Sequence, residues 1–314
     1  MLTRPPEYAW KLAVLAGGDS PERAISLSSG DQVAAALRRA GHTCALIDPR
    51  EIALSEIAWT RFDACVIALH GGAGEDGRVQ AQLEQLGVAY TGSGPVASRL
   101  AMSKSASKER FVQAGVASPP YSLFHVHEGD DDLGRRLSSL GFPLVVKPDS
   151  QGSSVGLAFA AHEGELAAAV ATAAEFDSFV LAEPFLSGRE FTVGLLGREP
   201  LATLEIIKPG ALFDYDAKYR ADGPHARIAD LTATQAAQIQ DAALAAARSL
   251  GTRGIVRVDV ILDDGGQVWV LEVNSVPGLT AGSLVPQAAA ACGMDMSALA
   301  TWMVRDALHE EVAL

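Results

Sequence analysis

Four polar residues stand in two otherwise apolar segments, at spacings that suit the binding of a charged ligand. Arg257 and Asp259 are separated by one residue in the segment VRVDVILD. Glu272 and Asn274 have the same spacing in VWVLEVN. Side chains on a β-strand alternate between its faces, so the members of each pair share a face. The sequence DDGG at 263–266 predicts a turn that folds both strands into a hairpin, where all four side chains can share one face.

The oxygen atoms of Asp259, Glu272 and Asn274 could hold a divalent cation on that face. Side chains directly opposite each other in a hairpin have Cβ atoms about 5 Å apart. Carboxylate and amide oxygens favour Mg²⁺ or Mn²⁺ over zinc, which prefers His and Cys. A solvated sheet face on which Arg257 forms a salt bridge with either carboxylate explains the same residues without a metal. The hairpin by itself does not separate these interpretations.

A second candidate is the loop KPDSQGSSVG at 147–156. Lys147 ends an expected strand, and the small residues after it allow backbone N–H groups to approach a ligand closely. Such a loop, with a lysine as a point charge, suits the phosphates of a nucleoside triphosphate. It lacks the Gly-Lys-Ser/Thr ending of a Walker A loop. A flexible hairpin turn is the alternative interpretation.

A third candidate is the segment LAEPFLSGREFTV at 181–193. Its apolar and aromatic residues could wall an adenine, and Glu183 or Glu190 could bind ribose hydroxyls. A linker that packs against the core explains the same residues.

Composition narrows the class of protein. The chain has 314 residues, 48% of them hydrophobic, which is enough for two or three domains. Its formal net charge of −13 argues against a nucleic-acid or anionic-membrane partner. The three cysteines are far apart and without metal-ligand spacing, as in a reducing compartment. No signal peptide or apolar stretch of about 20 residues is present, so we expect a soluble, cytoplasmic protein.

The elements that must position these residues follow from periodicity and turn signals. Short apolar strands at 12–16, 44–47 and 64–69, with a helix at 28–40, predict a parallel α/β sheet. Further along, we expect strands at 144–147 and 179–183 and helices at 105–114, 163–174 and 296–308. A helix at 232–250 begins with a capping box and carries one apolar face.

Taken in order, these segments resemble the ATP-grasp ligases, and among them the D-alanine–D-alanine ligases. Five further motifs carry the resemblance over nearly the whole chain: GGDSPERAISLSSG at 17–30, HGGAGEDGRVQ at 70–80, YTGSG at 90–94, YDAKY at 215–219 and NSVPGLTAGSLVP at 274–286. The resemblance implies an α/β and α+β fold, in which a Rossmann-like parallel-sheet domain precedes a two-subdomain ATP-grasp fold. We place the N-terminal substrate-binding domain at 1–102, the central ATP-grasp subdomain at 103–187 and the C-terminal subdomain at 188–314.

The resemblance also implies a reaction. The carboxylate of one D-alanine attacks the γ-phosphate of ATP, and the amine of a second D-alanine displaces phosphate from the acyl phosphate. Two Mg²⁺ or Mn²⁺ ions and a homodimer belong to this picture, which places the enzyme in peptidoglycan precursor synthesis. The alternatives are an ATP-grasp ligase that joins other amino acids in a secondary pathway, and a non-catalytic nucleotide-binding relative. A dinucleotide oxidoreductase is disfavoured because Gly17 and Gly18 are not part of a GxGxxG sequence.

By resemblance, each site residue receives a role. Metal binding falls to Asp259, Glu272 and Asn274. The ATP site comprises Lys104, Lys147, Gly152, Ser153, Ser154, Glu183, Phe185, Leu186 and Glu190. The catalytic set comprises Glu22, His70, Ser153, Lys218, Tyr219, Arg257 and Gly278, with Arg257 and the Gly278 N–H on the oxyanion. The amino-acid substrates are held by Glu22, His70, Lys218, Tyr219, Ser283 and Leu284.

Several of these residues also have plainly structural explanations. Glu22 could be a carboxylate at a helix start, Ser283 a helix N-cap and Tyr219 a surface residue. The same resemblance implies that Tyr219 in the sequence AKY favours an amine over a hydroxyl as the second nucleophile, because family members that make the dipeptide carry tyrosine or phenylalanine there.

The sequence departs from the family pattern at three places. Ala24 stands where a carboxylate is usual, and IAD at 228–230 replaces a Cys-Pro-Ala segment in the loop 219–231. Ser103 precedes Lys104 where aspartate is usual, so we expect that lysine to be held differently.

Overall fold

The computed structural model describes residues 9–126, 136–137, 139–207 and 225–309. The predicted site residues Lys218 and Tyr219, with the whole YDAKY motif, lie outside the described residues. Within the described part of the chain, every helix is too short or too polar to cross a membrane.

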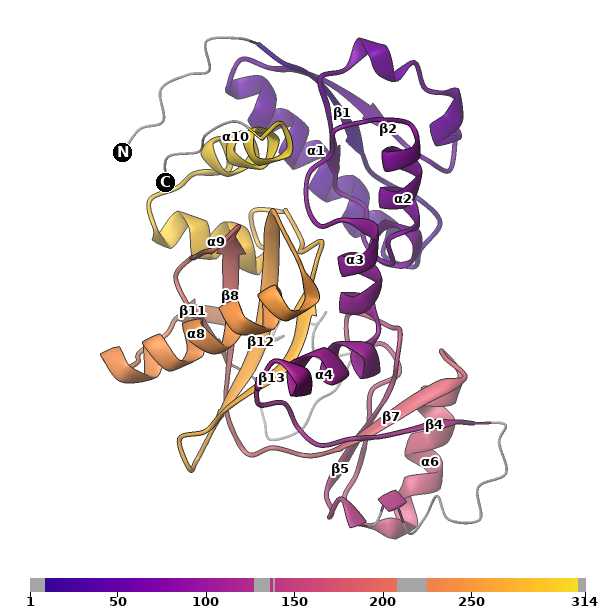
Figure 1. Cartoon of the computed structure of the whole chain (residues 1–314), viewed down its shortest axis with the longest axis vertical. Coiled ribbons are helices and arrows are strands. Elements are labelled where there is room, and N and C mark those ends of the chain that lie inside the picture. Colours follow the sequence, from indigo (N-terminus) through magenta and orange to yellow (C-terminus); the bar gives the residue numbers. More distant parts are fainter. Residues whose placement is uncertain (1–8, 127–135, 138, 208–224, 310–314) are drawn as a thin grey trace.

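The N-terminal part forms the predicted parallel sheet (Figure 1). Strands β1 (Lys11–Leu15), β2 (Thr43–Ile47) and β3 (Ala64–Ile67) pair in the order β2-β1-β3. Helix α1 (Arg23–Arg39) packs beside β1 and β2. The remaining short elements of this region are η1 (Leu54–Glu56), η2 (Trp59–Arg61), η3 (Gly72–Gly74), α2 (Arg78–Gln85) and α3 (Pro95–Met102).

Helix α1 begins five residues before the predicted start at residue 28, which corrects that boundary. The sequence SLSSG resembles a turn, but Ser26, Ser29 and Gly30 form the buried face of the helix. A Cβ atom on Gly30 would lie 2.3 Å from the Cβ atom of Ala16, so only glycine allows this approach. Close packing between helix and strand overrides local propensity here.

A second, antiparallel sheet lies in the range 122–184. Its strands β4 (Ser122–His125), β5 (Leu144–Pro148), β6 (Ala158–Ala160) and β7 (Phe179–Pro184) pair in the order β4-β7-β5-β6. Helix α6 (Glu163–Ala174) has the predicted bounds and packs on β5, β6 and β7. Helix α4 (Lys104–Gln113) connects this region to α3.

The third sheet carries the hairpin and has the order β11-β10-β8-β12-β13, with β9 paired to β8. Its strands are β8 (Gly188–Leu196), β9 (Glu199–Pro200), β10 (Leu204–Ile207), β11 (His225–Ile228), β12 (Ile255–Asp263) and β13 (Val268–Asn274). Helix α8 (Ala233–Leu250) covers one face of it and begins with the predicted capping box of Thr232 and Gln235. Each of the three sheets therefore lies within one of the predicted domain ranges.

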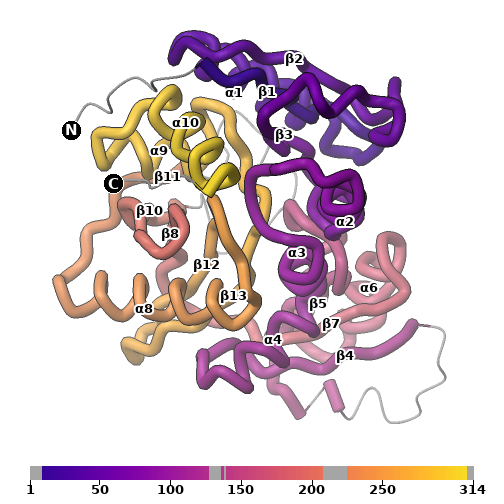
Figure 2. The backbone as a smooth tube through the Cα atoms, turned by 45° about the horizontal axis from the view of Figure 1, so that its top comes forward, coloured from indigo at the N-terminus to yellow at the C-terminus, as the bar shows by residue number. Residues whose placement is uncertain are grey.

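The last two helices return to the N-terminal part (Figure 2). Helix α9 (Leu284–Ala291) packs on β8, and α10 (Met296–Ala307) packs on α1. The Ser297 hydroxyl donates to the Ala36 carbonyl at 3.0 Å. One hydrophobic core accordingly joins residues from β1, α1, α9 and α10.

A β-bulge puts the polar residues of the hairpin on one face. Plain alternation along β13 would give Glu272 the same face as Val268 and Val270. The register instead shifts between Asp259 and Val260, and the extra residue is Leu271. Val268, Val270 and Val273 all join the core under α8. The bulge thereby turns the next polar residues to the opposite face.

Candidate active site

The polar face of the hairpin lines a cavity that opens to solvent. Arg257, Asp259 and Glu272 line it from the hairpin, and Lys104 and Lys147 line it from α4 and β5. The rest of the lining comes mainly from the loop after β5 and from β8: Pro148, Gln151, Ser154, Val155, Leu157, Glu190 and Leu271. Three of the segments singled out in the sequence thus meet around one space.

The predicted pairing of the hairpin is confirmed. Arg257 lies opposite Asn274, and Asp259 lies opposite Glu272. The Arg257 guanidinium donates from Nε and Nη2 to the Asp259 carboxylate at 3.0 and 2.9 Å, and its Nη2 lies 4.0 Å from Glu272 Oε1. The Thr192 hydroxyl donates to Asp259 Oδ1 at 2.6 Å.

The salt bridge of the alternative interpretation therefore exists, but the side chains of Arg257 and Asp259 are only 16% exposed, so it is not a solvated one. Burial by itself would lower the pKa of Arg257, yet the carboxylates of Asp259 and Glu272 outweigh burial and raise it. The guanidinium is thus held charged inside the cavity.

The donor set of the hairpin suits a hard cation. Asp259 and Glu272 supply carboxylate oxygens, and Asn274 supplies an amide oxygen that accepts from Val276 N at 3.0 Å. Within the described ranges, no three His, Cys, Asp or Glu residues gather as a metal-binding group. Two carboxylates and an amide would leave coordination positions for oxygens of a bound phosphate.

Lys147 is held by a buried ion-pair network. Its Nζ donates to Glu183 Oε2 at 2.7 Å, and Lys108 Nζ lies 2.6 Å from Glu183 Oε1. Burial alone would raise the pKa of Glu183, but the two ammonium groups lower it. The carboxylate predicted to hold the nucleoside is therefore engaged by two lysines, and its contact with adenosine stays a prediction.

Lys104 is the first residue of α4 and is largely buried. Its Nζ donates to the backbone carbonyl of Gln151 in the loop after β5. Burial lowers the pKa of Lys104, and the carboxylate of Glu272 opposes that effect. Lys104 thus links the helix to the loop at the edge of the cavity.

The loop at 150–156, called the covering loop below, contributes Gln151, Ser154 and Val155 to the lining of the cavity. Ser153 and Ser154 both have positive φ, 53° and 60°. For residues other than glycine this left-handed conformation costs roughly 1–2 kcal/mol each, so tertiary contacts must hold it. One such contact is from the Ser153 hydroxyl, which donates to Glu22 Oε1 in the N-terminal domain.

That contact separates the two interpretations of Glu22. Glu22 stands at the N-cap position of α1, yet its side chain makes no cap hydrogen bond. The carboxylate instead reaches a serine 131 residues away in sequence. Glu22 is therefore not a simple helix-start carboxylate, and its contact with the substrate stays a prediction.

His70 is buried at the same junction. Its Nε2 lies 2.9 Å from the Ser29 hydroxyl, and its Nδ1 lies 3.6 Å from Glu75 Oε1. Ser29 Oγ also accepts from Leu279 N at 3.4 Å. His70 thereby contacts both the N-terminal helix α1 and the glutamate of the HGGAGEDG motif.

The segment 275–283 approaches from the C-terminal subdomain. Ser283 stands at the N-cap position of α9 without a cap hydrogen bond, and its Oγ lies 2.8 Å from Thr280 Oγ1. A Cβ atom on Gly278 would lie 2.7 Å from Ser283 Oγ, so a larger residue there would displace the Ser283 side chain. The N-terminus of α9, at Leu284, offers unpaired backbone N–H groups of the kind that bind carboxylates.

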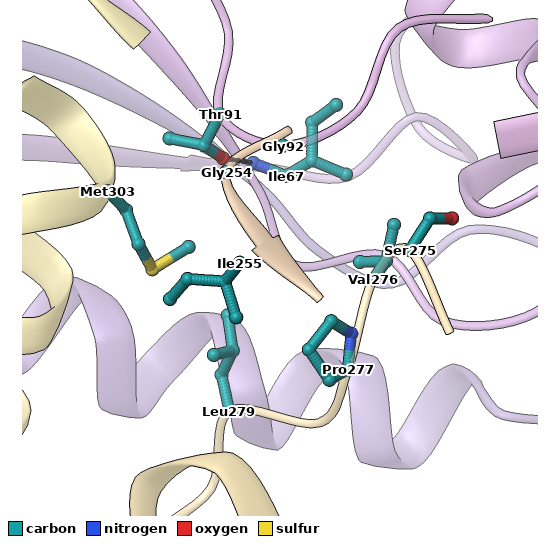
Figure 3. Close-up of a pocket in the computed structure, with 10 residues that line it drawn as sticks. All are labelled: Ile67, Thr91, Gly92, Gly254, Ile255, Ser275, Val276, Pro277, Leu279 and Met303. Carbon is teal, nitrogen blue, oxygen red and sulfur yellow. Dashed lines mark hydrogen bonds between the residues drawn. The ribbon is translucent and has the colours of Figure 1, made fainter. Parts of the chain in front are cut away.

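The segment 275–283 and the YTGSG motif line the same small apolar pocket (Figure 3). Thr91 Oγ1 accepts from Ile67 N at 3.1 Å. A Cβ atom on Gly254 would lie 2.8 Å from Gly92 Cα, so two glycines allow the backbones to touch. The pocket is completed by Ile255, Ser275, Val276, Pro277, Leu279 and Met303.

Phe185 and Leu186 lie in the short connection between β7 and β8. Phe185 packs edge-on against Phe159, with ring centroids 5.5 Å apart, and its N–H donates to the Pro143 carbonyl at 2.8 Å. Glu190 on β8 lines the cavity. Their contacts with adenosine stay predictions.

Sequence reasoning missed three residues of this site. Lys108 follows Lys104 by four residues and lies on the same helix face as the buried Phe111, a spacing that could have revealed it. Thr192 is a polar residue in the apolar strand β8, opposite Asp259. Glu75 gives no such signal, because its motif resembles an exposed turn.

Comparisons with known proteins agree with this geometry. The family model described as D-ala D-ala ligase C-terminus matches residues 111–305. The D-alanine–D-alanine ligase of Bordetella petrii is 43% identical and covers 98% of this chain and 95% of its own. That of Alkalilimnicola ehrlichii is 42% identical, with 96% of each chain covered. The crystal structure of the Bacillus anthracis ligase complexed with ATP has a TM-score of 0.85 and 31% identity over 96% of this chain and 98% of its own. This chain belongs to the D-alanine–D-alanine ligase family.

Proposed function

We propose that this protein joins two molecules of D-alanine to D-alanyl-D-alanine at the expense of ATP, through an acyl phosphate, for peptidoglycan precursor synthesis. One observation carries the proposal. The face with Arg257, Asp259 and Glu272 lies across a single cavity from Lys104 and Lys147. An arrangement of cations opposite carboxylates is what the transfer of a phosphoryl group to a carboxylate needs.

The lysines and the covering loop account for ATP. Lys104 and Lys147 would neutralise the phosphates, with the backbone of Gly152, Ser153 and Ser154 above them. Phe185, Leu186 and Glu190 would enclose adenosine at the connection between β7 and β8. Asp259, Glu272 and Asn274 would hold two Mg²⁺ or Mn²⁺ ions, which neutralise phosphate charge when bound.

The first step forms the acyl phosphate. A carboxylate oxygen of the first D-alanine attacks the γ-phosphorus, the bond to the bridging oxygen breaks, and ADP leaves. Glu22 would hold the ammonium of this substrate, and His70 would contact its carboxylate. The hydrogen bond from the Ser153 hydroxyl to Glu22 supports this role, because it would hold the covering loop over the substrate and keep water from the acyl phosphate.

The second step forms the peptide bond. The amine of the second D-alanine, freed of one proton, attacks the acyl carbon. Arg257 and the Gly278 N–H would stabilise the oxyanion, and phosphate then leaves with the electron pair of the broken C–O bond. Ser283 and the Leu284 N–H, at the start of α9, would bind the carboxylate of this substrate. Lys218 and Tyr219 would complete the cover.

A panel of acceptors tests the proposal. Phosphate release from Mg·ATP is measured with D-alanine, L-alanine, D-serine, D-lactate plus D-alanine, or no amino acid, and the products are weighed by mass spectrometry. Turnover with D-alanine alone, giving the dipeptide, is the expected result. Release with another amino acid only would favour the alternative ligase, and absence of turnover with every acceptor would favour a nucleotide-binding relative.

We also propose that the enzyme works as a homodimer in the cytoplasm. The family resemblance and the free state of Cys44, Cys65 and Cys292 support this setting. Light scattering of the purified protein at micromolar concentration should give twice the mass of one chain, and the mass of one chain would contradict the dimer.

A further inference from the structure

We infer that Asp149 is a positioning residue that ties the covering loop to the helix carrying Lys104. The inference rests on the proposed function in one respect, namely that Lys104 contacts ATP. Asp149 lies directly after β5 and is 6% exposed. It belongs to the loop sequence KPDSQGSSVG at 147–156.

Both carboxylate oxygens of Asp149 contact the start of α4. Oδ1 accepts from Ser105 N at 2.7 Å, and Oδ2 accepts from the Ser103 hydroxyl at 2.8 Å. The Asp149 backbone carbonyl accepts from Lys104 N at 3.1 Å. Three consecutive residues of the helix start are therefore bonded to one residue of the loop.

The electrostatics of α4 explain why a carboxylate is needed. The helix has no acidic residue in its first turn, and its N-cap Ser103 is neutral. A helix N-terminus carries partial positive charge and unpaired N–H groups, which a carboxylate satisfies. Asp149 supplies that negative charge from outside the helix. Ser103 stands where the family pattern has aspartate, and Asp149 supplies a carboxylate to the same helix start from the loop.

Helix α4 and the loop are consequently joined by hydrogen bonds at both Asp149 and Gln151. Lys104 Nζ donates to the carbonyl of Gln151, two residues after Asp149. On its other side the loop is anchored by Ser150 N, which donates to Asp177 Oδ2 at 2.9 Å. Asp149 therefore determines where the Lys104 ammonium lies relative to the loop that covers the phosphates.

Exchanging the two side chains tests the inference. In Asp149→Ser, Ser105 N and the Ser103 hydroxyl lose their charged acceptor. In Ser103→Asp, two carboxylates face each other across the same contact. The double variant Ser103→Asp/Asp149→Ser rebuilds it, because an N-cap aspartate accepts from the first-turn N–H groups and from the hydroxyl at 149.

The measured quantities are the Kd of Mg·ATP by calorimetry, KM for ATP, kcat and the unfolding midpoint. Each single variant should weaken Mg·ATP binding about tenfold, the scale of one charge-assisted hydrogen bond, and raise KM more than it lowers kcat. The double variant should return to within about threefold of the wild type, a typical mark of coupled neighbours.

A matched control is Asp295→Ser, which removes the N-cap carboxylate of α10, whose Oδ1 accepts from Ala298 N at 2.8 Å. It should leave the Kd unchanged. Losses that multiply in the double variant, or single variants that bind as the wild type does, would overturn the inference. Failure of the proposed function has a different signature, namely a wild-type protein that makes no dipeptide. In that case the inference about Asp149 is still tested by the Kd of Mg·ATP for the wild type, the two single variants and the double variant.

Discussion

At the scale of single residues, the site is a set of charges that neutralise one another inside a partly buried cavity. Lys147 is held by Glu183, and Arg257 is held by Asp259. The residue types of this set could be predicted from the sequence because each stands in a recognisable motif. The pair of Arg257 and Asp259 could also be foreseen, because the two residues share one face of one strand. The partners of Glu183 could not, because Lys108 and Lys147 lie on other elements far away in sequence and meet it only in the folded chain.

Lys108 provides a test through pH. Burial lowers its pKa to about 8 against the attraction of Glu183. An unfolded chain keeps a lysine pKa of about 10.4, so between pH 8 and that value the unfolded state binds more protons and the folded state gains stability as pH rises. Lys108→Met removes this gain. Chemical denaturation at pH 7.5 and 9.5 should show a wild-type free energy of unfolding that rises by about 1–2 kcal/mol relative to the variant. A constant difference would contradict the assignment.

Arg257 provides a test of chemistry against binding. Arg257→Ala removes the oxyanion donor, so kcat should fall about 10²–10³-fold while ATP still binds. Glu272→Gln is the matched variant on the same face, and it should instead raise the Mg²⁺ concentration needed for half-maximal rate. Near-normal turnover by Arg257→Ala would remove the guanidinium from its role.

At the scale of elements, the hairpin shows which structural features the sequence pattern predicts and which it does not. The turn, both strands and the apolar face of α8 were predicted, and Ile239, Ala243, Ala246 and Leu250 are all buried as expected. The bulge at Leu271 was not, because the residues at 268–271 are all apolar and do not show which of them is the extra one. The early start of α1 was missed because the buried positions in its first half are serine and glycine, which carry no apolar periodicity.

Deleting Leu271 tests the bulge. The deletion removes the extra residue, so plain alternation leaves Glu272 on the polar face and keeps Val270 and Val273 in the core under α8. The deletion variant should therefore retain the fold, with a thermal unfolding midpoint close to that of the wild type. Leu271→Ala keeps the extra residue and should retain the fold as well. A midpoint of the deletion variant far below that of Leu271→Ala would contradict the assignment of Leu271 as the extra residue.

At the scale of the whole molecule, three regions of the chain meet at the loop 150–156. This loop lines the cavity together with the lysines and the hairpin, and its Ser153 hydroxyl donates to Glu22 in the N-terminal part. The shared role of these residues in one reaction stays a prediction from the family motifs. The packing of α9 and α10 against the N-terminal part was not predicted. It is made by apolar side chains, and an apolar helix face does not reveal which element it packs against.

Ser153→Ala tests the connection between domains. Without the hydroxyl, Glu22 loses its contact with the loop, so amide hydrogen exchange at 151–156 should accelerate about tenfold in the free protein. The matched variant Ser187→Ala removes an exposed hydroxyl that donates to Asp264 at 3.1 Å, and it should leave exchange at 151–156 unchanged. Unaltered protection in Ser153→Ala would show that the contact does not hold the loop.

The most direct test of the account follows the oxygen atoms of the substrate. The wild-type protein is incubated with Mg·ATP and D-alanine labelled with ¹⁸O in both carboxylate oxygens. The ¹⁸O content of the released phosphate and the amount of dipeptide are then measured by mass spectrometry. An acyl phosphate predicts one ¹⁸O atom in each phosphate, in equal amount to D-alanyl-D-alanine. Unlabelled phosphate, released by attack of water on ATP, would contradict the reaction assigned to this site.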